Sequence, residues 1–138
     1  MIDLSKVYHY FYTGKEKAAQ VLGDVFDFFS VKVYSLIALF FDLLGWIMVF
    51  FIMSKNKEGA IVLHYSVDFG VDLIGDASQL IVVPVLGLII LISNLILLLI
   101  LNQHKSFKFL SHLLLAVAMA VNVFLTLSLV PIYLLNFS

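Results

Sequence analysis

The sequence predicts an all-α membrane protein: three transmembrane helices in a bundle, preceded by an amphipathic juxtamembrane helix, with a short external β-like segment. Three observations lead to this fold class. Hydrophobic residues make up 63% of the chain, whereas soluble domains have about 45–50%. Residues 80–101 and 109–130 are two uncharged runs, each long enough to cross a bilayer as a helix. Residues 61–74 instead alternate between apolar and polar positions, which is typical of a strand.

Residues 1–33 are expected to form a cytoplasmic tail and an amphipathic helix. Thr13 and Glu16 match the Thr-x-x-Glu capping box that begins many helices. After this box, apolar residues recur at helical spacing, and Lys17 and Asp24 fall between them. We therefore expect a helix that lies on the membrane surface or leads directly into the first span. The aromatic residues before it either lie at the headgroup level or belong to a loosely ordered tail.

The rest of the chain divides into three spans and their connections. These are transmembrane helix 1 at 34–53, an external loop at 54–79, helix 2 at 80–101, a cytoplasmic turn at 102–108 and helix 3 at 109–135. The turn is so short that helices 2 and 3 must be antiparallel neighbours. Pro84 falls in the first turns of helix 2, where its missing N–H costs little.

Each span carries one strongly polar residue near its centre, and we expect these residues to meet. The predicted intramembrane polar cluster is Asp42, Asn94 and Asn122, with Thr126 one turn further. A central Asp costs about 2.5–3.5 kcal/mol, which the apolar residues of helix 1 offset. Small residues on the same faces would let the helices approach closely: Ser35, Ala38, Gly45, Gly87, Ser111 and Ala118.

This cluster has two interpretations. Interhelical hydrogen bonds contribute about 0.6–2 kcal/mol each in membranes, so the cluster can be purely structural. Alternatively, Asp42 marks a proton or cation site, since acidic residues inside membranes often lie on ion paths. The sequence offers no basic residue and no second acid at the same depth, which favours the structural interpretation.

The alternating segment carries its apolar residues at every second position: Leu63, Tyr65, Val67, Phe69, Val71 and Leu73. A strand needs a partner for its backbone N–H and C=O groups. The segment either folds back into a hairpin, pairs with the same segment of another copy, or accepts a strand from a different protein. We expect the apolar face to lie against the bilayer surface or the outer ends of the spans. The predicted partner-docking residues are Tyr65, Val67, Phe69 and Val71.

The lysines predict the orientation. With the amino terminus inside, six lysines lie on the cytoplasmic side and two lie outside. The inner ones are Lys6, Lys15, Lys17, Lys32, Lys105 and Lys108, and the outer ones are Lys55 and Lys57. Cytoplasmic loops carry an excess of Lys and Arg, so we expect the amino terminus inside and the carboxyl terminus outside.

No catalytic, metal or cofactor signature is present in the sequence. The absence of Cys excludes disulfides, thiolate metal sites and a Cys nucleophile. The four histidines fall on both sides of the membrane, and Asp68, Asp72 and Asp76 lack the spacing of a known calcium loop. A net charge of −1 gives no footprint for nucleic acid. We expect a protein that is not an enzyme and has neither cofactor nor metal.

Residues 64–75, HYSVDFGVDLIG, resemble a signature of small, functionally uncharacterised three-span membrane proteins of candidate-phyla bacteria. In those proteins a His-Tyr-Asn-x-x-Phe-Gly-(Val/Ile)-Asp-Leu-Ile-Gly motif precedes a Leu-rich helical hairpin. The resemblance extends over residues 62–130. The chain departs from the pattern at Ser66, where the family has Asn, and at Asp76-Ala77, where it has Pro and an aromatic residue. The resemblance implies a bacterial cytoplasmic (inner) membrane and the same architecture, but no activity.

These observations favour a non-enzymatic accessory or scaffold subunit of the membrane that docks a partner protein. Its expected partners are the lipid bilayer and another membrane protein or further copies of itself. The alternative from a different class is a small transport or ion-coupling component that uses Asp42. A membrane-embedded hydrolase or transferase ranks third, because the sequence lacks paired acids and a nucleophile with a base.

Overall fold

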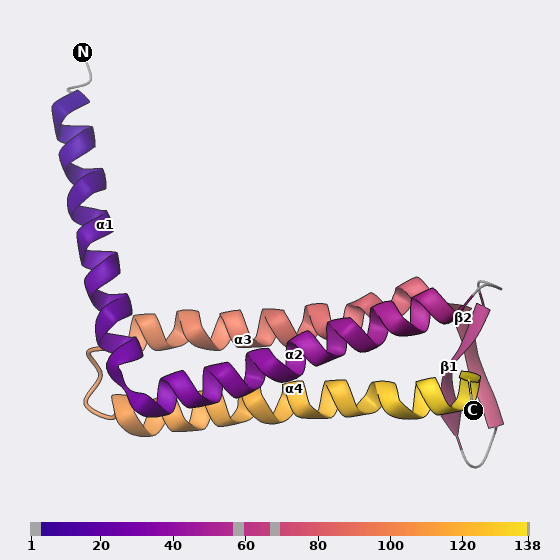
Figure 1. Ribbon diagram of the computed structural model, residues 1–138. Helices are drawn as coiled ribbons and strands as arrows, with labels where there is room; N and C mark the ends of the chain where they lie inside the picture. Colours follow the sequence, from indigo (N-terminus) through magenta and orange to yellow (C-terminus); the bar gives the residue numbers. More distant parts are fainter. Residues whose placement is uncertain (1–3, 57–59, 67–69, 138) are drawn as a thin grey trace.

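The computed structural model describes residues 4–56, 60–66 and 70–137 (Figure 1). Its elements, in chain order, are α1 (Leu4–Asp27), α2 (Phe29–Lys55), β1 (Ala60–Ser66), β2 (Gly70–Asp76), the 3₁₀ helix η1 (Ala77–Ile81), α3 (Val82–Leu101) and α4 (Phe107–Phe137). Helices α2, α3 and α4 lie side by side as a bundle, with α3 antiparallel to the other two. The β1–β2 hairpin lies across one end of the bundle, and α1 lies at the other end.

Three helices are long and apolar enough to cross a membrane, as the sequence predicts. They are Phe29–Lys55, Ala77–Leu101 and Phe107–Phe137. The first and third extend beyond the predicted limits at both ends, whereas the second ends at Leu101 as predicted and begins with η1 at Ala77. Helix α2 begins at Phe29 rather than at residue 34, because Val31 in its first turn is already part of the buried core. Helix α4 continues through Pro131 to Phe137, since a proline inside a membrane helix removes only one backbone hydrogen bond.

The core of the bundle consists of three groups of buried side chains along its length. The group near α1 contains Val25, Val31, Leu98, Phe107 and Leu115. The middle group contains only Ala38, Leu91 and Ala118. The group below the hairpin contains Val49, Ile52, Ile61, Ala77, Leu80 and Leu129. The small side chains of the middle group let the helices approach closely at half height, which brings their polar residues together.

Helix α1 begins at Leu4, so the prediction that the Thr13 capping box starts this helix is wrong. The residues between Leu4 and Thr13 include no Pro or Gly, and the helix therefore extends back past the box. The last turns of α1 touch the bundle, where Val25 is buried. The extended backbone of Phe28 separates α1 from α2, and Figure 1 shows α1 turning away from the bundle axis there. This geometry suits a helix that lies on a membrane surface.

The strand prediction for residues 61–74 is confirmed, and its partner is the second half of the same segment. β1 and β2 pair antiparallel, with Ile61 opposite Gly75 and Val62 opposite Ile74. The register shifts on either side of His64, and Gly70 supplies the positive φ of 75° at the turn into β2. The structure therefore shows a hairpin within one chain.

The predicted apolar face is only partly correct. Ile61 is buried and Leu63 is partly buried, and both pack on the ends of the helices. Leu73, however, is 53% exposed, because the register shift places it opposite the exposed His64 rather than opposite Leu63. Val67 and Phe69 lie outside the described residues, and so do the side chains of Tyr65 and Val71.

Candidate functional site

The free edge of β1 is closed by a side chain from the end of α4. The backbone N–H of Val62 donates to Oδ1 of Asn136 at 2.9 Å, and Nδ2 of Asn136 donates to the carbonyl oxygen of Val62 at 2.9 Å. Nδ2 also donates to the carbonyl oxygen of Ile132 at 2.8 Å, which orients the amide. Asn136 thus takes the place that a neighbouring strand would occupy.

The two hydrogen bonds between Val62 and Asn136 also show in which direction the backbone N–H and C=O groups of Ile74, on β2, point. Both backbone groups of Val62 point away from β2, so Val62 and Ile74 form a non-hydrogen-bonded pair. In an antiparallel ladder, the backbone groups of the opposite residue then point outward as well. The N–H and C=O of Ile74 therefore face the outer edge of β2, where no partner exists within the described part of the chain.

No described residue covers the outer edge of β2. β1 packs on α4 and η1, whereas the contacts of β2 are made almost entirely to β1. The side chains of Leu73 and Ile74 are 53% and 64% exposed. We call this edge, with its exposed residues Leu73 and Ile74, the β2 edge. Its unpaired backbone and apolar side chains could hold an added strand.

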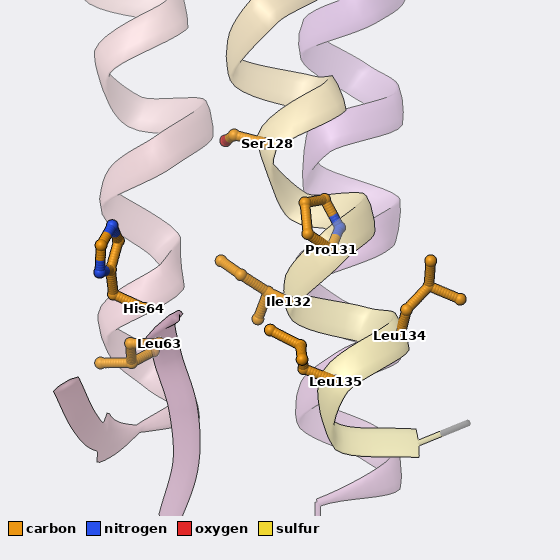
Figure 2. A pocket seen from close by; sticks show the side chains of 7 residues that line it. All are labelled: Leu63, His64, Ser128, Pro131, Ile132, Leu134 and Leu135. Atoms are coloured by element: carbon orange, nitrogen blue, oxygen red, sulfur yellow. The ribbon is translucent and has the colours of Figure 1, made fainter. Parts of the chain in front are cut away.

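A cavity of about 670 Å³ lies between β1 and the last turns of α4 (Figure 2). Its walls come from two elements: Leu63 and His64 on β1, and Ser128, Pro131, Ile132, Leu134 and Leu135 on α4. Figure 2 shows Ile132 and Leu135 pointing toward β1. The hydroxyl of Ser128 donates to the carbonyl oxygen of Leu125 in its own helix. The remaining wall is mostly apolar, so the cavity is suited to an apolar side chain or a lipid tail.

Three of the four predicted members of the intramembrane polar cluster come together at the centre of the bundle. Asp42, Asn122 and Thr126 are all buried. The side-chain amide of Asn122 donates to the carbonyl oxygen of Gly87 on α3 at 3.3 Å. The Thr126 hydroxyl donates to the carbonyl oxygen of Phe41 on α2 at 2.8 Å. These two bonds connect α4 to both other helices of the bundle.

The fourth member, Asn94, is not part of this cluster. Its amide donates to the carbonyl oxygen of Ile90 in the same helix. Gly87 is the residue of α3 that faces Asp42 and Asn122. Asn94 follows Gly87 by two turns of the helix, which at 1.5 Å per residue is about 10 Å along α3. The prediction that Asn94 meets Asp42 and Asn122 near the centre of the bundle is therefore wrong.

Asp42 carries a buried oxygen without a partner. The indole of Trp46 lies one turn later on α2, on the same face of the helix as the carboxyl group. The Oδ1 atom of Asp42 has no hydrogen-bond partner among the described residues. An unpaired buried oxygen in an apolar bundle is costly, so Asp42 is the candidate functional residue of this cluster.

Two polar contacts at the hairpin end of the bundle were not predicted from the sequence. One is Asn136 with β1, and the other is Lys55, whose ammonium donates to the hydroxyl of Tyr133 at 3.0 Å and lies over the Phe51 ring. The one feature of the sequence that points to the Asn136 contact is a side-chain amide in the last turn of an otherwise apolar helix. Its partner lies 74 positions away and has no pattern that would reveal it.

No group of three or more potential metal ligands occurs in the part of the chain that the structure describes. Comparison of the chain with family models, with curated proteins and with solved structures found no match.

Proposed function

We propose that the protein is a non-enzymatic accessory or scaffold subunit of a membrane, and that it docks a partner protein at the β2 edge. The observation that supports this proposal is the difference between the two edges of the hairpin. The edge of β1 is closed by Asn136, whereas that of β2 is open and carries two exposed apolar side chains. Proteins usually protect such edges, because an open one accepts strands from other chains.

In this proposal the partner adds an extended segment to β2. Backbone hydrogen bonds to Ile74 provide affinity, and the side chains of Leu73 and Ile74 provide a local apolar contact. The hairpin is held against the bundle through Ile61 and Asn136, so the edge is presented on a fixed support. A fixed edge loses less conformational entropy on binding than a mobile strand would.

We further propose that the protein resides in the bacterial cytoplasmic (inner) membrane, with the amino terminus inside. The bacterial location depends on the resemblance of residues 64–75, and the orientation depends on the lysines. The fold supports a difference between the two sides. The α3–α4 turn and α1 lie at one end of the bundle, and the hairpin lies at the other with the carboxyl terminus (Figure 1).

A matched pair of proline variants tests the docking proposal. Ile74→Pro removes an outward N–H from the open edge, where proline is tolerated because no ladder bond is lost. Ala60→Pro places a proline at the first position of β1, on the closed side of the hairpin. After gentle solubilisation of native membranes, we expect recovery of the partner to fall at least tenfold with Ile74→Pro and to stay unchanged with Ala60→Pro. Equal recovery with both variants would refute docking at β2.

A second candidate function is that of a small transport or ion-coupling component. The unpartnered Oδ1 of Asp42 is the observation that favours it. The two candidates differ in the effect of Asp42→Asn. A docking subunit should tolerate this change, whereas an ion-coupling component should keep its assembly and lose its activity in cells.

A further inference from the structure

Two side-chain oxygens meet at the surface of Gly87. A Cβ atom built on Gly87 would lie 2.7 Å from Oδ1 of Asp42, and it would collide with Oδ1 of Asn122. The two oxygens, one from α2 and one from α4, therefore share the space that the missing side chain of α3 leaves open. The arrangement joins all three helices of the bundle at one point.

Neither Asn122 nor Thr126 can donate a hydrogen bond to Asp42. The amide nitrogen of Asn122 already donates to two carbonyl oxygens, those of Ala118 at 2.9 Å and Gly87 at 3.3 Å. An amide has two N–H hydrogens, so both are used and Asn122 turns its acceptor oxygen toward Asp42. The hydroxyl of Thr126 has one hydrogen, and it is donated to Phe41.

Two acceptor oxygens that face the same small space in an apolar interior repel each other unless a hydrogen or a cation lies between them. No charged group is available to compensate a carboxylate. Helix α3 contains no titratable residue, and the titratable residues of α2 and α4 other than Asp42 lie near the helix ends. Near the Asp42 carboxyl group lie Gly87, Asn122 and the Trp46 indole, none of which carries a charge.

We propose that Asp42 is a proton-binding site: its Oδ1 carries a proton and donates it to Oδ1 of Asn122, closing α2 against α4. A protonated carboxyl is a donor as well as an acceptor, so one proton satisfies both oxygens. Loss of the proton leaves a carboxylate facing an acceptor, and α2 then separates from α4. This inference is independent of docking at β2, since the site lies at half height of the bundle and the β2 edge lies beyond its end.

Infrared spectroscopy of the purified protein tests the protonation directly. Near neutral pH, exposed aspartates are ionised, so the carbonyl stretch of a protonated carboxyl group should come from Asp42. We expect this band in the wild type, a shift of the band after labelling with ¹³C-aspartate, and its loss in Asp42→Asn. The isotope shift needs no variant and therefore does not depend on how Asp42→Asn folds.

Thermal unfolding over a range of pH tests whether loss of the Asp42 proton destabilises the contact between α2 and α4. We expect the Tm of the wild type to fall in alkaline solution as Asp42 loses its proton, and the Tm of Asp42→Asn to stay level. Asn94→Leu, which removes a polar residue of α3 outside the cluster, should retain the alkaline fall of the wild type. The proposal is overturned if the wild type lacks the carboxyl band and its Tm rises when Na⁺ is added at constant ionic strength. That combination would show that a cation, and not a proton, occupies the site.

Discussion

At the scale of single residues, Gly87 determines how closely α3 can approach the other helices of the bundle. Its missing side chain leaves the space in which the Asp42 and Asn122 oxygens meet. Neither oxygen is at the end of a long flexible side chain, and both belong to buried residues. An added methyl group at this position must therefore displace the polar cluster or push α3 outward.

We predict that Gly87→Ala lowers the free energy of unfolding by about 1–3 kcal/mol, the usual cost of an overpacked core. Gly23→Ala is the matched control, because a Cβ at Gly23 in α1 would meet no atom within 4 Å. The control should stabilise α1 by up to about 1 kcal/mol, since alanine favours helix more than glycine does. Unfolding in detergent, followed by circular dichroism, measures both. Equal effects of the two substitutions would contradict the proposed close contact at Gly87.

At the scale of elements, the short helix η1 joins the hairpin to α3. Asp76 caps it: the carboxylate accepts a hydrogen bond from the backbone N–H of Ser78 at 2.7 Å. This backbone hydrogen bond, together with one from the Ser78 hydroxyl, lowers the pKa of Asp76 below its ordinary value of 3.8. Because both bonds favour the carboxylate, the cap is fully formed above pH 3.8 and is lost as the pH falls through the lowered value.

Ser78→Ala separates the contributions of the two Ser78 donors, the backbone N–H and the hydroxyl, to the lowered pKa of Asp76. This substitution removes the hydroxyl and keeps the backbone N–H, which is the larger cause of the lowered pKa. We predict that the titration midpoint of Asp76 rises in the variant but stays below the ordinary value. Carbon NMR of the labelled Asp76 carboxyl group in detergent micelles measures it. A midpoint unchanged from that of the wild type would mean that the hydroxyl makes no contribution.

At the scale of the whole molecule, the two ends of the bundle differ in both structure and charge. One end holds α1 and the turn between α3 and α4, with the exposed Lys105 and Lys108. The other end holds the hairpin and the last turn of α4, where aromatic rings surround Lys55. Aromatic residues and single lysines at a helix end are typical of the boundary between membrane and water.

The proposed orientation predicts which end an impermeant thiol reagent can reach on intact cells. The chain contains no Cys, so single cysteines can be introduced without a background. Ala60→Cys, at the exposed start of β1, should be labelled, and Ser106→Cys, in the exposed turn between α3 and α4, should be labelled only after the cells are opened. Labelling of position 106 alone on intact cells would invert the topology.

The sequence by itself determined the features that depend on the composition and periodicity of a single segment. Long apolar runs predict the three helices, because each residue adds to the transfer free energy of its own segment. Alternation from Leu63 to Leu73 predicts a strand, because side chains of a strand point to opposite faces in turn. The small and polar residues of α2 and α4, such as Ala38 and Asn122, likewise show which faces of those helices are buried.

Only the tertiary structure decided which of these residues meet. The identity of the contacts depends on the relative depth and rotation of packed helices, and no local pattern of the chain encodes either. Thus Gly87 rather than Asn94 faces Asp42, since α3 is offset along the bundle relative to the predicted common centre. Asn136 likewise closes the edge of β1 only because α4 continues past Pro131 and ends beside the hairpin. A hydrogen bond forms over about 3 Å, and a shift of one residue along a helix is already about 1.5 Å, so these contacts follow from the completed fold and not from any segment alone.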